Sequence, residues 1–187
     1  MYGELSRKLL ELSRGEIYNY REEPFTLASG ARSHHYFNCR KITLYPERLA
    51  LLARAIRDEV LPGEGLEDIP AAGGLTLGAD PIAVALALSY QEQGRTLFPL
   101  IVRKEAKGHG LGRKIEGEWE GAERVLALDD VITTGGSTLK AVFALREAGL
   151  EVSSAVCVVD REEGGAEALR NEGVELYSVF KKSDFLK

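Results

Sequence analysis

The clearest chemical signal in the sequence is an apolar run that ends in two acids and is followed by hydroxyls and glycines. The run spans residues 124–128, and the residues after it are Asp129, Asp130, Val131, Ile132, Thr133, Thr134, Gly135, Gly136 and Ser137. Glycines let a backbone approach a ligand closely, and hydroxyls with the free amides of a helix start can surround a phosphate. Two adjacent carboxylates would repel that phosphate unless they accepted hydrogen bonds from a diol, such as the 2- and 3-hydroxyls of ribose. The segment therefore predicts a site for a phosphorylated sugar.

Other interpretations of this segment fit less well. It lacks the Gly-Lys-Ser/Thr ending of a nucleoside triphosphate loop and the G-x-G-x-x-G pattern of a dinucleotide fold. The plain structural alternative is a helix N-terminus with favourable acids and capping residues. Capping needs one such residue, whereas residues 129–137 supply seven.

A second segment, residues 102–117, concentrates charge and glycine between two predicted strands. It contains five Lys or Arg residues, one His and four Gly, without an apolar period. Such an arm is suited to closing over a polyanion such as pyrophosphate and to excluding water. His109 can change its charge near neutral pH, which suits a group that meets a leaving pyrophosphate. The simpler alternative is a solvated basic loop.

These segments need a scaffold, and the apolar patterning predicts one. A helix is expected over residues 4–14 with Gly15 as its stop signal, followed by strands at 25–29 and 35–42 and a helix from Pro46 to Pro62. From residue 68 onward strands and helices alternate. Strands are expected to end at Gly73-Gly74 and to cover 96–102, 124–130, 152–160 and 174–179, with helices at about 79–92 and 136–148 and a short helix before the last strand.

This alternation predicts an α/β fold with a mostly parallel central sheet flanked by helices. At 187 residues, with no internal repeat or linker, the chain is expected to form a single domain. Residues 1–45 would form a small N-terminal hood, and residues 46–187 would form the α/β core.

Composition excludes several classes of protein. The net charge of -5 gives no general attraction to nucleic acid or to an anionic membrane, so anion binding must come from a local cluster. No apolar run approaches the ~20 residues that span a bilayer. The first 15 residues mix acids and bases, unlike a signal peptide, so a cytoplasmic protein is expected. Cys39 and Cys157 lack the spacing of a zinc site or a disulfide framework.

The two motifs resemble those of a known enzyme family. Residues 124–137 are similar to the phosphoribosyl pyrophosphate (PRPP) signature of the type I phosphoribosyltransferases. That resemblance implies that Asp129 and Asp130 hold the ribose hydroxyls and that residues 133–137 bind the 5-phosphate. The cationic arm resembles the catalytic loop that distinguishes orotate phosphoribosyltransferases from their purine relatives. The matching residues are Arg103, Lys104, Glu105, Lys107, His109 and Gly110.

Three further segments resemble parts of the same family. Residues 25–30 match its F-x-L-x-S-G flap, which implies that Tyr36 and Phe37 line the orotate site together with Thr133. Residues 73–81 resemble its pyrophosphate loop, which implies a role for Thr76 and Leu77. Arg161 matches its contact to the orotate carboxylate. Two departures stand out, because Ala28 and Leu77 occupy positions where many members carry Lys.

The resemblance implies that orotate attacks the anomeric carbon of PRPP, giving orotidine 5-phosphate and pyrophosphate in pyrimidine (UMP) biosynthesis. Mg²⁺ is the expected cofactor, bound through substrate oxygens with no confident protein ligand. A homodimer is implied, because in this family the catalytic loop reaches the partner subunit's site. Two alternatives stay open: transfer to another base, and a non-catalytic regulator that senses PRPP.

Overall fold

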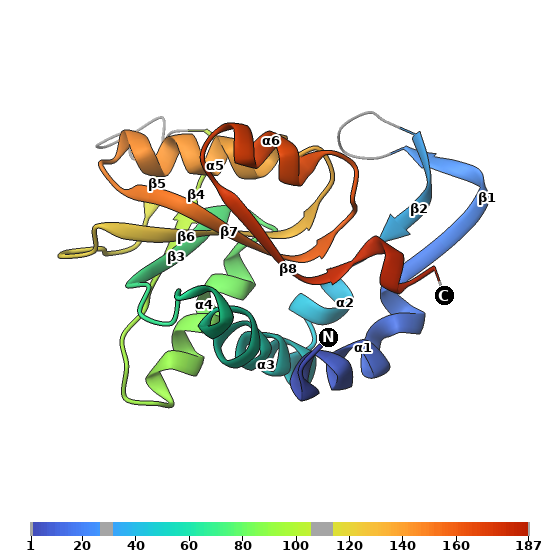
Figure 1. Ribbon diagram of the computed structural model, residues 1–187, viewed down its shortest axis with the longest axis horizontal. Coiled ribbons are helices and arrows are strands. Elements are labelled where there is room, and N and C mark those ends of the chain that lie inside the picture. Colours follow the sequence, from blue (N-terminus) through green and yellow to red (C-terminus); the bar gives the residue numbers. More distant parts are fainter. Residues whose placement is uncertain (1, 27–31, 106–113, 187) are drawn as a thin grey trace.

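The computed structural model describes residues 2–26, 32–105 and 114–186, which fold around a six-stranded sheet (Figure 1). In sheet order the strands are β5 (Ile115–Glu116), β4 (Phe98–Val102), β3 (Ala71–Leu75), β6 (Arg124–Ile132), β7 (Glu151–Asp160) and β8 (Glu175–Lys181). The helices are α1 (Glu4–Ile17), α2 (Arg40–Thr43), α3 (Pro46–Ala55), α4 (Asp80–Gln91), α5 (Gly136–Glu147) and α6 (Gly165–Asn171). All neighbouring strands are parallel except the edge pair β4 and β5. The predicted α/β fold with a mostly parallel sheet is confirmed.

Helices cover both faces of this sheet. In Figure 1, α5 and α6 lie on one side of the sheet, and α3 and α4 lie on the other. The side chains of β6 alternate between the two faces of the sheet, which explains why both faces are covered. Leu126 and Leu128 enter the core shared with α3 and α4. Val125 and Ala127 enter the second core, beneath α5. Successive side chains of a strand point to opposite faces, so an unbroken apolar strand requires cover on both.

The glycines of β3 are required by close backbone packing. An added Cβ at Gly74 would lie 1.9 Å from the carbonyl oxygen of Leu128, and one at Gly73 would lie 2.2 Å from that of Leu100. Real Cβ atoms do not approach backbone oxygens this closely. Glycine at both positions therefore lets the C-terminal end of β3 lie tightly between β4 and β6.

The first helix is longer than the sequence pattern predicts. Gly15 does not end α1, which continues to Ile17. The reason is burial, because Leu9, Ser13 and Ile17 repeat every four residues on one face and each is 0 % exposed. Leu12 of the same helix lies off this face and is 39 % exposed.

A small antiparallel sheet follows α1. It pairs β1 (Tyr18–Thr26) with β2 (Arg32–Phe37). The prediction of a strand over residues 35–42 is wrong after Phe37, where β2 ends and the chain turns to form the short helix α2. This turn carries Ile42 into the main core, where it is 0 % exposed.

An aromatic cluster joins this small sheet to the end of the chain. The ring of Phe37 packs 5.3 Å from that of Tyr18 and 5.2 Å from that of Phe185, measured between centroids. Phe185 in turn meets Phe180 of β8 edge-on at 5.9 Å. Offset and edge-on aromatic pairs add stability beyond their buried area. The cluster therefore fixes β2 against the main sheet.

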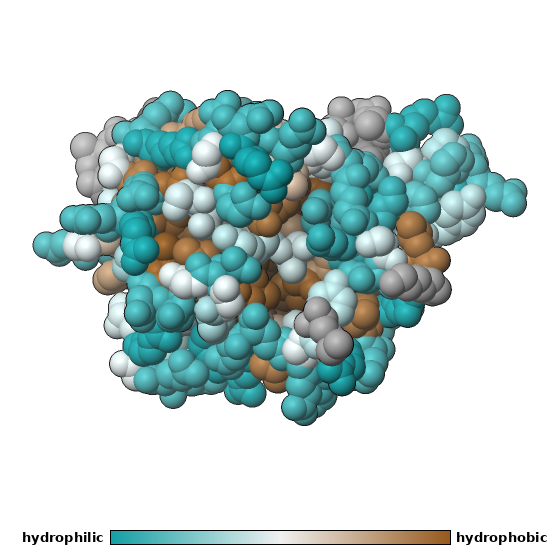
Figure 2. All heavy atoms as spheres, viewed as in Figure 1, coloured by the Kyte–Doolittle hydropathy of each residue, from teal (hydrophilic) through white to brown (hydrophobic). Residues whose placement is uncertain are grey.

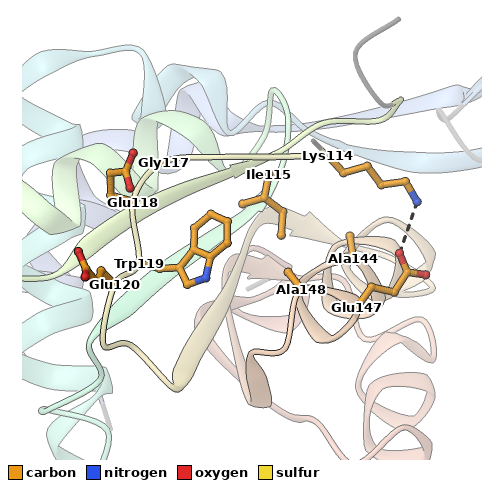
Figure 3. Close-up of a pocket in the computed structure, with 9 residues that line it drawn as sticks. All are labelled: Lys114, Ile115, Gly117, Glu118, Trp119, Glu120, Ala144, Glu147 and Ala148. Atoms are coloured by element: carbon orange, nitrogen blue, oxygen red, sulfur yellow. Dashed lines mark ion pairs between the residues drawn. The ribbon is translucent and has the colours of Figure 1, made fainter. Parts of the chain in front are cut away.

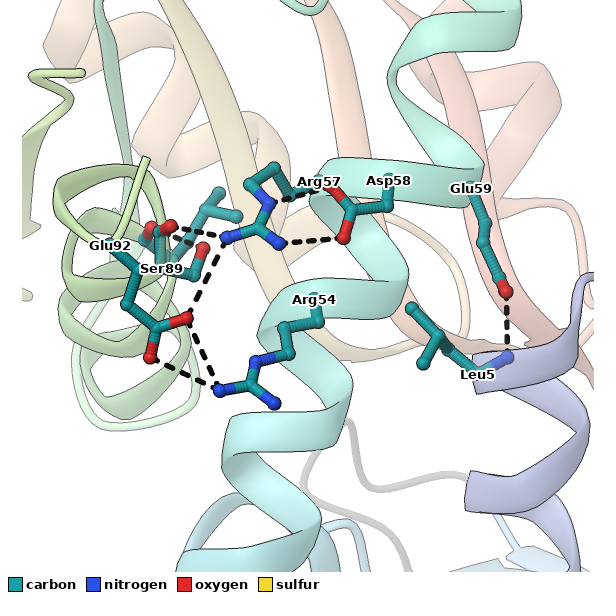
Figure 4. Close-up of polar contacts among 8 residues, drawn as sticks. Leu5, Arg54, Arg57, Asp58, Glu59, Ser89 and Glu92 are labelled. Carbon is teal, nitrogen blue, oxygen red and sulfur yellow. Dashed lines mark hydrogen bonds and ion pairs between the residues drawn. The ribbon is translucent and has the colours of Figure 1, made fainter. Parts of the chain in front are cut away.

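The N-terminus of α1 is capped by a side chain from a distant segment. After α3 the chain makes a π-helical turn, Ile56–Val60, which presents Glu59 to the start of α1. The Glu59 carboxylate accepts hydrogen bonds from the amides of Leu5 and Ser6, at 2.6 and 3.0 Å, and from the Ser6 hydroxyl at 2.6 Å. Figure 4 shows the contact to Leu5. A carboxylate at this position satisfies free amides and complements the helix dipole.

The same turn is tied to α4 through a buried guanidinium. Arg57 donates to both carboxylate oxygens of Asp58, at 2.7 and 2.6 Å, and to the backbone oxygen of Ser89 (Figure 4). Arg54 bonds Glu92 at the end of α4 at 3.2 Å. These contacts hold α3 against α4, the helix that begins beside the candidate site.

Hydrophobic residues gather at the centre of the face shown in Figure 2, over the region occupied by the sheet in Figure 1, with hydrophilic residues around them. Most of β8 is half-buried, as is typical of an edge strand. In the described part of the chain, no helix has the length and apolar character needed to cross a membrane.

Replacing Glu59 with Ala tests the cap. We expect the free energy of unfolding to fall by about 1–3 kcal/mol, because two helix-start amides and a hydroxyl lose their acceptor. Urea denaturation measures the change, and Glu11→Ala, on the exposed side of α1, is the matched control. Equal stability of the two variants would contradict the proposed capping role.

Candidate active site

The predicted sugar-phosphate segment lies where β6 ends and α5 begins. Gly135 adopts a φ of 80°, the left-handed region that favours glycine, and the helix starts at the next residue. The segment borders a cavity of about 480 Å³. The lining residues are Tyr36, Phe37, Asn38, Cys39, Arg40, Asp129, Asp130, Val131, Ile132, Thr133, Thr134, Gly135, Gly136, Ser137, Thr138, Lys140 and Arg161. The structure thus brings every predicted residue of 129–137 into one cavity with Tyr36, Phe37 and Arg161.

The two acids occupy different environments. Asp129 is 7 % exposed, and its carboxylate accepts hydrogen bonds from the Thr138 hydroxyl at 2.8 Å and from the Asp130 amide at 2.9 Å. Burial raises the pKa of Asp129 to about 7, a rise to which the Asp130 charge adds and which the Thr138 hydrogen bond opposes. Asp130 is only half-buried, and its Oδ1 accepts a hydrogen bond from the amide of Val131 at 2.8 Å. Asp130 is therefore the more open carboxylate.

The predicted pyrophosphate segment lies beside the acids. An added Cβ at Gly78 would lie 2.8 Å from Asp130 Oδ1 and 3.1 Å from Asp129 Oδ1. The Thr76 amide donates to the Val102 oxygen at 2.8 Å, and the peptide bond between Thr76 and Leu77 is cis. The Leu77 side chain is 75 % exposed, so the segment meets the acid pair through its backbone.

Sequence reasoning missed the residue that anchors this segment. Asp80, at the start of α4, accepts a hydrogen bond from the Thr76 hydroxyl through Oδ2 at 2.6 Å. Its other carboxylate oxygen is buried and has no partner among the described residues. An acid just before Pro at a helix start was the available signal.

Two cations on the cavity wall were also missed. Arg40 and Lys140 line the cavity, and both side chains are exposed. Lys140 lies one helical turn after Gly136, a spacing that could have marked it as a neighbour of the phosphate loop. Arg40 and Lys140 add local positive charge to a cavity that also contains two carboxylates.

Tyr36 and Phe37 differ in how freely they face the cavity. Phe37 is 6 % exposed and belongs to the aromatic cluster that holds the small sheet. Tyr36 is half-buried and stacks on Phe25, with ring centroids 5.2 Å apart. Adjacent residues on a strand face opposite sides, so one of the pair is committed to packing.

Arg161 connects the small sheet to the end of β7. Its backbone amide donates to the Ile132 oxygen at 2.9 Å. Its Nη2 donates to Ser33 Oγ at 2.8 Å, the His35 oxygen at 3.3 Å and Glu163 Oε1 at 3.0 Å. The Nε atom is buried with no acceptor among residues that the structure describes. Arg161 therefore borders the cavity with one donor still unsatisfied.

The predicted catalytic arm is described only at its base. The backbone amide of Arg103 donates a hydrogen bond to the Lys114 carbonyl oxygen at 2.8 Å, and its guanidinium forms an ion pair with Glu116 at 3.2 Å. Lys104 and Glu105 are exposed. Lys107, His109 and Gly110 lie outside the described residues, as does Ala28 of the flap.

A second cavity, of about 740 Å³, lies at the other end of α5. Trp119, Ile115, Ala144 and Ala148 form its apolar part, and an ion pair between Lys114 and Glu147 at 3.6 Å borders it (Figure 3). None of the predicted substrate-binding residues lines it. Within the described ranges, no group of three or more His, Cys, Asp or Glu side chains could hold a metal ion.

A parallel sheet that presents an acid pair, a loop rich in glycine and hydroxyls and a neighbouring backbone segment at the C-terminal ends of β3 and β6 defines the type I phosphoribosyltransferase class. No protein-family model matches the chain. Similar proteins identify the family more narrowly. The chain is 54 % identical over 177 residues to the orotate phosphoribosyltransferase of Leptospira biflexa, covering 95 % of each chain, and 48 % identical over 180 residues to that of Aquifex aeolicus, covering 96 % of each.

A solved structure agrees with these relatives. The orotate phosphoribosyltransferase of Mycobacterium tuberculosis in complex with PRPP superposes with a TM-score of 0.75 at 34 % identity, over 99 % of this chain and 93 % of that one. The chain belongs to the orotate phosphoribosyltransferase family.

The tight contact between Gly78 and the acids can be tested by substitution. In Gly78→Ala the new Cβ would displace both carboxylates, so we expect PRPP to bind about tenfold more weakly or worse. Isothermal titration calorimetry measures the affinity. Gly63→Ala is the control, since a Cβ there meets nothing within 4 Å. Unchanged PRPP affinity in Gly78→Ala would show that the position of the acids does not matter.

Proposed function

We propose that the protein transfers the 5-phosphoribosyl group of PRPP to orotate, giving orotidine 5-phosphate and pyrophosphate in pyrimidine biosynthesis. The observation that carries this proposal is the acid pair, with Asp129 buried and Asp130 half-buried, set between the loop of residues 133–137 and the backbone of Gly78 in one cavity with Arg161. Relatives of this name, 54 % and 48 % identical, support it.

In this proposal the ribose 5-phosphate is held at the start of α5. The amides and hydroxyls of residues 133–137 would surround the 5-phosphate, where the helix dipole favours negative charge. The carboxylates of Asp129 and Asp130 would accept hydrogen bonds from the ribose hydroxyls. The backbone of Thr76 and Leu77 would meet the pyrophosphate, with the exposed Lys140 adding positive charge to the cavity wall.

Orotate would lie between the small sheet and Arg161. Its carboxylate needs a cationic donor, and the buried Arg161 Nε has no acceptor within the described part of the chain. Tyr36 is the aromatic neighbour with the more accessible ring, and Thr133 and Phe37 complete the wall. An aromatic face and a fixed guanidinium together suit a planar, anionic base.

The cationic arm would act on the leaving group. Lys107, His109, Arg103 and Lys104 would stabilise charge on the departing pyrophosphate, and Glu105 belongs to the same motif. The reaction needs no protein nucleophile, because the base attacks the anomeric carbon through an oxocarbenium-like transition state.

Mg²⁺ is the proposed cofactor. Mg²⁺ prefers oxygen ligands and is commonly bound through substrate phosphates and water, which suits a substrate that carries pyrophosphate. When bound, the ion neutralises charge on the pyrophosphate and ribose oxygens. The chain's own residues then position the sugar, the phosphate and the base around it.

Two broader features are part of the proposal. A homodimer is proposed, with the arm of each subunit reaching the partner's site, because residues 103–110 resemble the family's catalytic loop, which reaches the partner subunit.

A cytoplasmic, single-domain enzyme is proposed as well, since both cysteines are buried and free, as is typical of a reducing compartment. No nucleic acid or membrane partner is proposed.

An activity assay with orotate, PRPP and Mg²⁺ tests the reaction, with uracil, hypoxanthine and adenine assayed in parallel. We expect turnover of orotate, and a loss of about 100-fold or more in Lys107→Ala, because an electrostatic donor to the transition state is removed. Lys8→Ala, at an exposed position of α1, is the control.

Other outcomes of this assay select the alternatives. Turnover of another base in place of orotate would reassign the substrate. Binding of PRPP without turnover of any base would replace the enzyme with a PRPP-sensing regulator.

Mixing two inactive variants tests the crossing of the arm between subunits. Lys107→Ala lacks the arm's cation and Asp130→Ala lacks a ribose acceptor, so a mixed dimer has one intact site only if the arm crosses. For random reassociation we expect about a quarter of wild-type activity, since half of the dimers are mixed and each has one working site of two. No recovery, with mixed dimers demonstrated by mass spectrometry, would place the arm in its own subunit.

A further inference from the structure

Thr138 is the side chain that donates a hydrogen bond to the buried acid of the pair. It lies in the first turn of α5, is 1 % exposed, and donates from Oγ1 to Asp129 Oδ2 at 2.8 Å. Ser137 and Thr134, its neighbours in the phosphate loop, are exposed. The Thr138 hydroxyl is thus turned away from solvent and toward the carboxylate, and its role differs from that of the phosphate-binding hydroxyls.

The surroundings of Asp129 give its charge little other support. Cys157 is its register partner on β7, and Cys39 approaches from the residue before α2. Burial and the nearby carboxylates raise the pKa of both thiols, which are therefore neutral at pH 7. Asp130 adds a second negative charge, and Gly78 brings no side chain. Among the residues that the structure describes, no cation forms an ion pair with Asp129.

Two hydrogen bonds therefore hold the Asp129 carboxylate, one from the Asp130 amide and one from Thr138. The amide is part of the backbone, so the Thr138 hydroxyl is the contact that a change of side chain can remove. A buried carboxylate that loses a donor becomes easier to protonate, and a protonated acid has lost acceptor capacity.

We propose that Thr138 is a positioning residue for phosphoribosyl transfer, which orients the Asp129 carboxylate toward the sugar and stabilises its charge through a hydrogen bond. The inference rests on the proposed function, in which Asp129 accepts a hydrogen bond from a ribose hydroxyl. Thr138 itself touches no substrate atom in this scheme.

The direction of the pH effect follows from the contact. The Thr138 hydrogen bond lowers the pKa of Asp129, against the larger effect of burial, and the resulting value is about 7. Without the hydroxyl the pKa rises further, so the ionised form required for sugar binding is reached only at higher pH. The acidic limb of the profile of kcat/KM for PRPP therefore moves to higher pH.

The test compares Thr138→Val, which keeps the shape and removes the hydroxyl, with Thr138→Ser, which keeps the hydroxyl. We expect Thr138→Val to lose about fivefold or more in kcat/KM for PRPP at pH 7 and to regain most of it at higher pH, since a rise of one unit from a pKa of about 7 lowers the ionised fraction of Asp129 at pH 7 from about a half to about a tenth. Thr138→Ser should retain the wild-type profile. Urea denaturation of both variants identifies any loss of folding.

Two results would overturn the inference. One is a wild-type profile in Thr138→Val, and the other is an equal, pH-independent loss in both variants, which would indicate a packing role alone. If the wild-type protein turns over no base, the proposed function fails. Calorimetric binding of PRPP across the same pH range then still decides the role of Thr138.

Discussion

The site depends on keeping two negative charges side by side at the end of β6. Asp129 and Asp130 are neighbours in sequence, next to a loop suited to bind phosphate, and their mutual repulsion opposes both folding and anion binding. The fold places the two acids in different environments. Asp129 is buried and held by Thr138 and a backbone amide, while Asp130 stays half-buried beside Gly78. Gly74 lets β3 pack closely against the backbone of β6 at Leu128, and Gly78 lets the segment after β3 approach the acids without a side chain.

The small sheet of β1 and β2 is joined to the core by contacts between residues far apart in the chain. Arg161 lies at the end of β7, next to the strand that carries the acids, and its guanidinium bonds Ser33 and the backbone oxygen of His35 on β2. Phe37 fixes the same strand through the aromatic cluster with Tyr18 and Phe185. One wall of the cavity is therefore attached to the core through a buried cation and a set of aromatic rings. A ligand that binds the Arg161 guanidinium would therefore contact the group that joins β2 to the core.

The sequence predicted most of the core, because its signals are local. The apolar run of β6, the alternation of strands and helices, and the acid, hydroxyl and glycine residues of 129–137 each occupy one continuous segment. The errors lie where tertiary burial overrides local preference. Gly15 did not end α1 because Ile17 is needed in the core, and residues 40–43 became helical because Ile42 is buried. The bonds of Arg161 to Ser33 and of Thr138 to Asp129 were not predictable, since both depend on how elements face each other after folding.

The central claim is that the acid pair binds the ribose hydroxyls, and one calorimetric comparison tests it most directly. Ribose 5-phosphate and 2-deoxyribose 5-phosphate would be titrated into the wild-type protein, Asp129→Ala and Asp130→Ala. The account predicts that the wild type binds the deoxy sugar about tenfold more weakly, a difference of about 1.4 kcal/mol, and that this difference disappears in one of the two variants. Equal affinity of the wild type for both sugars, or a preference that survives in both variants, would contradict it.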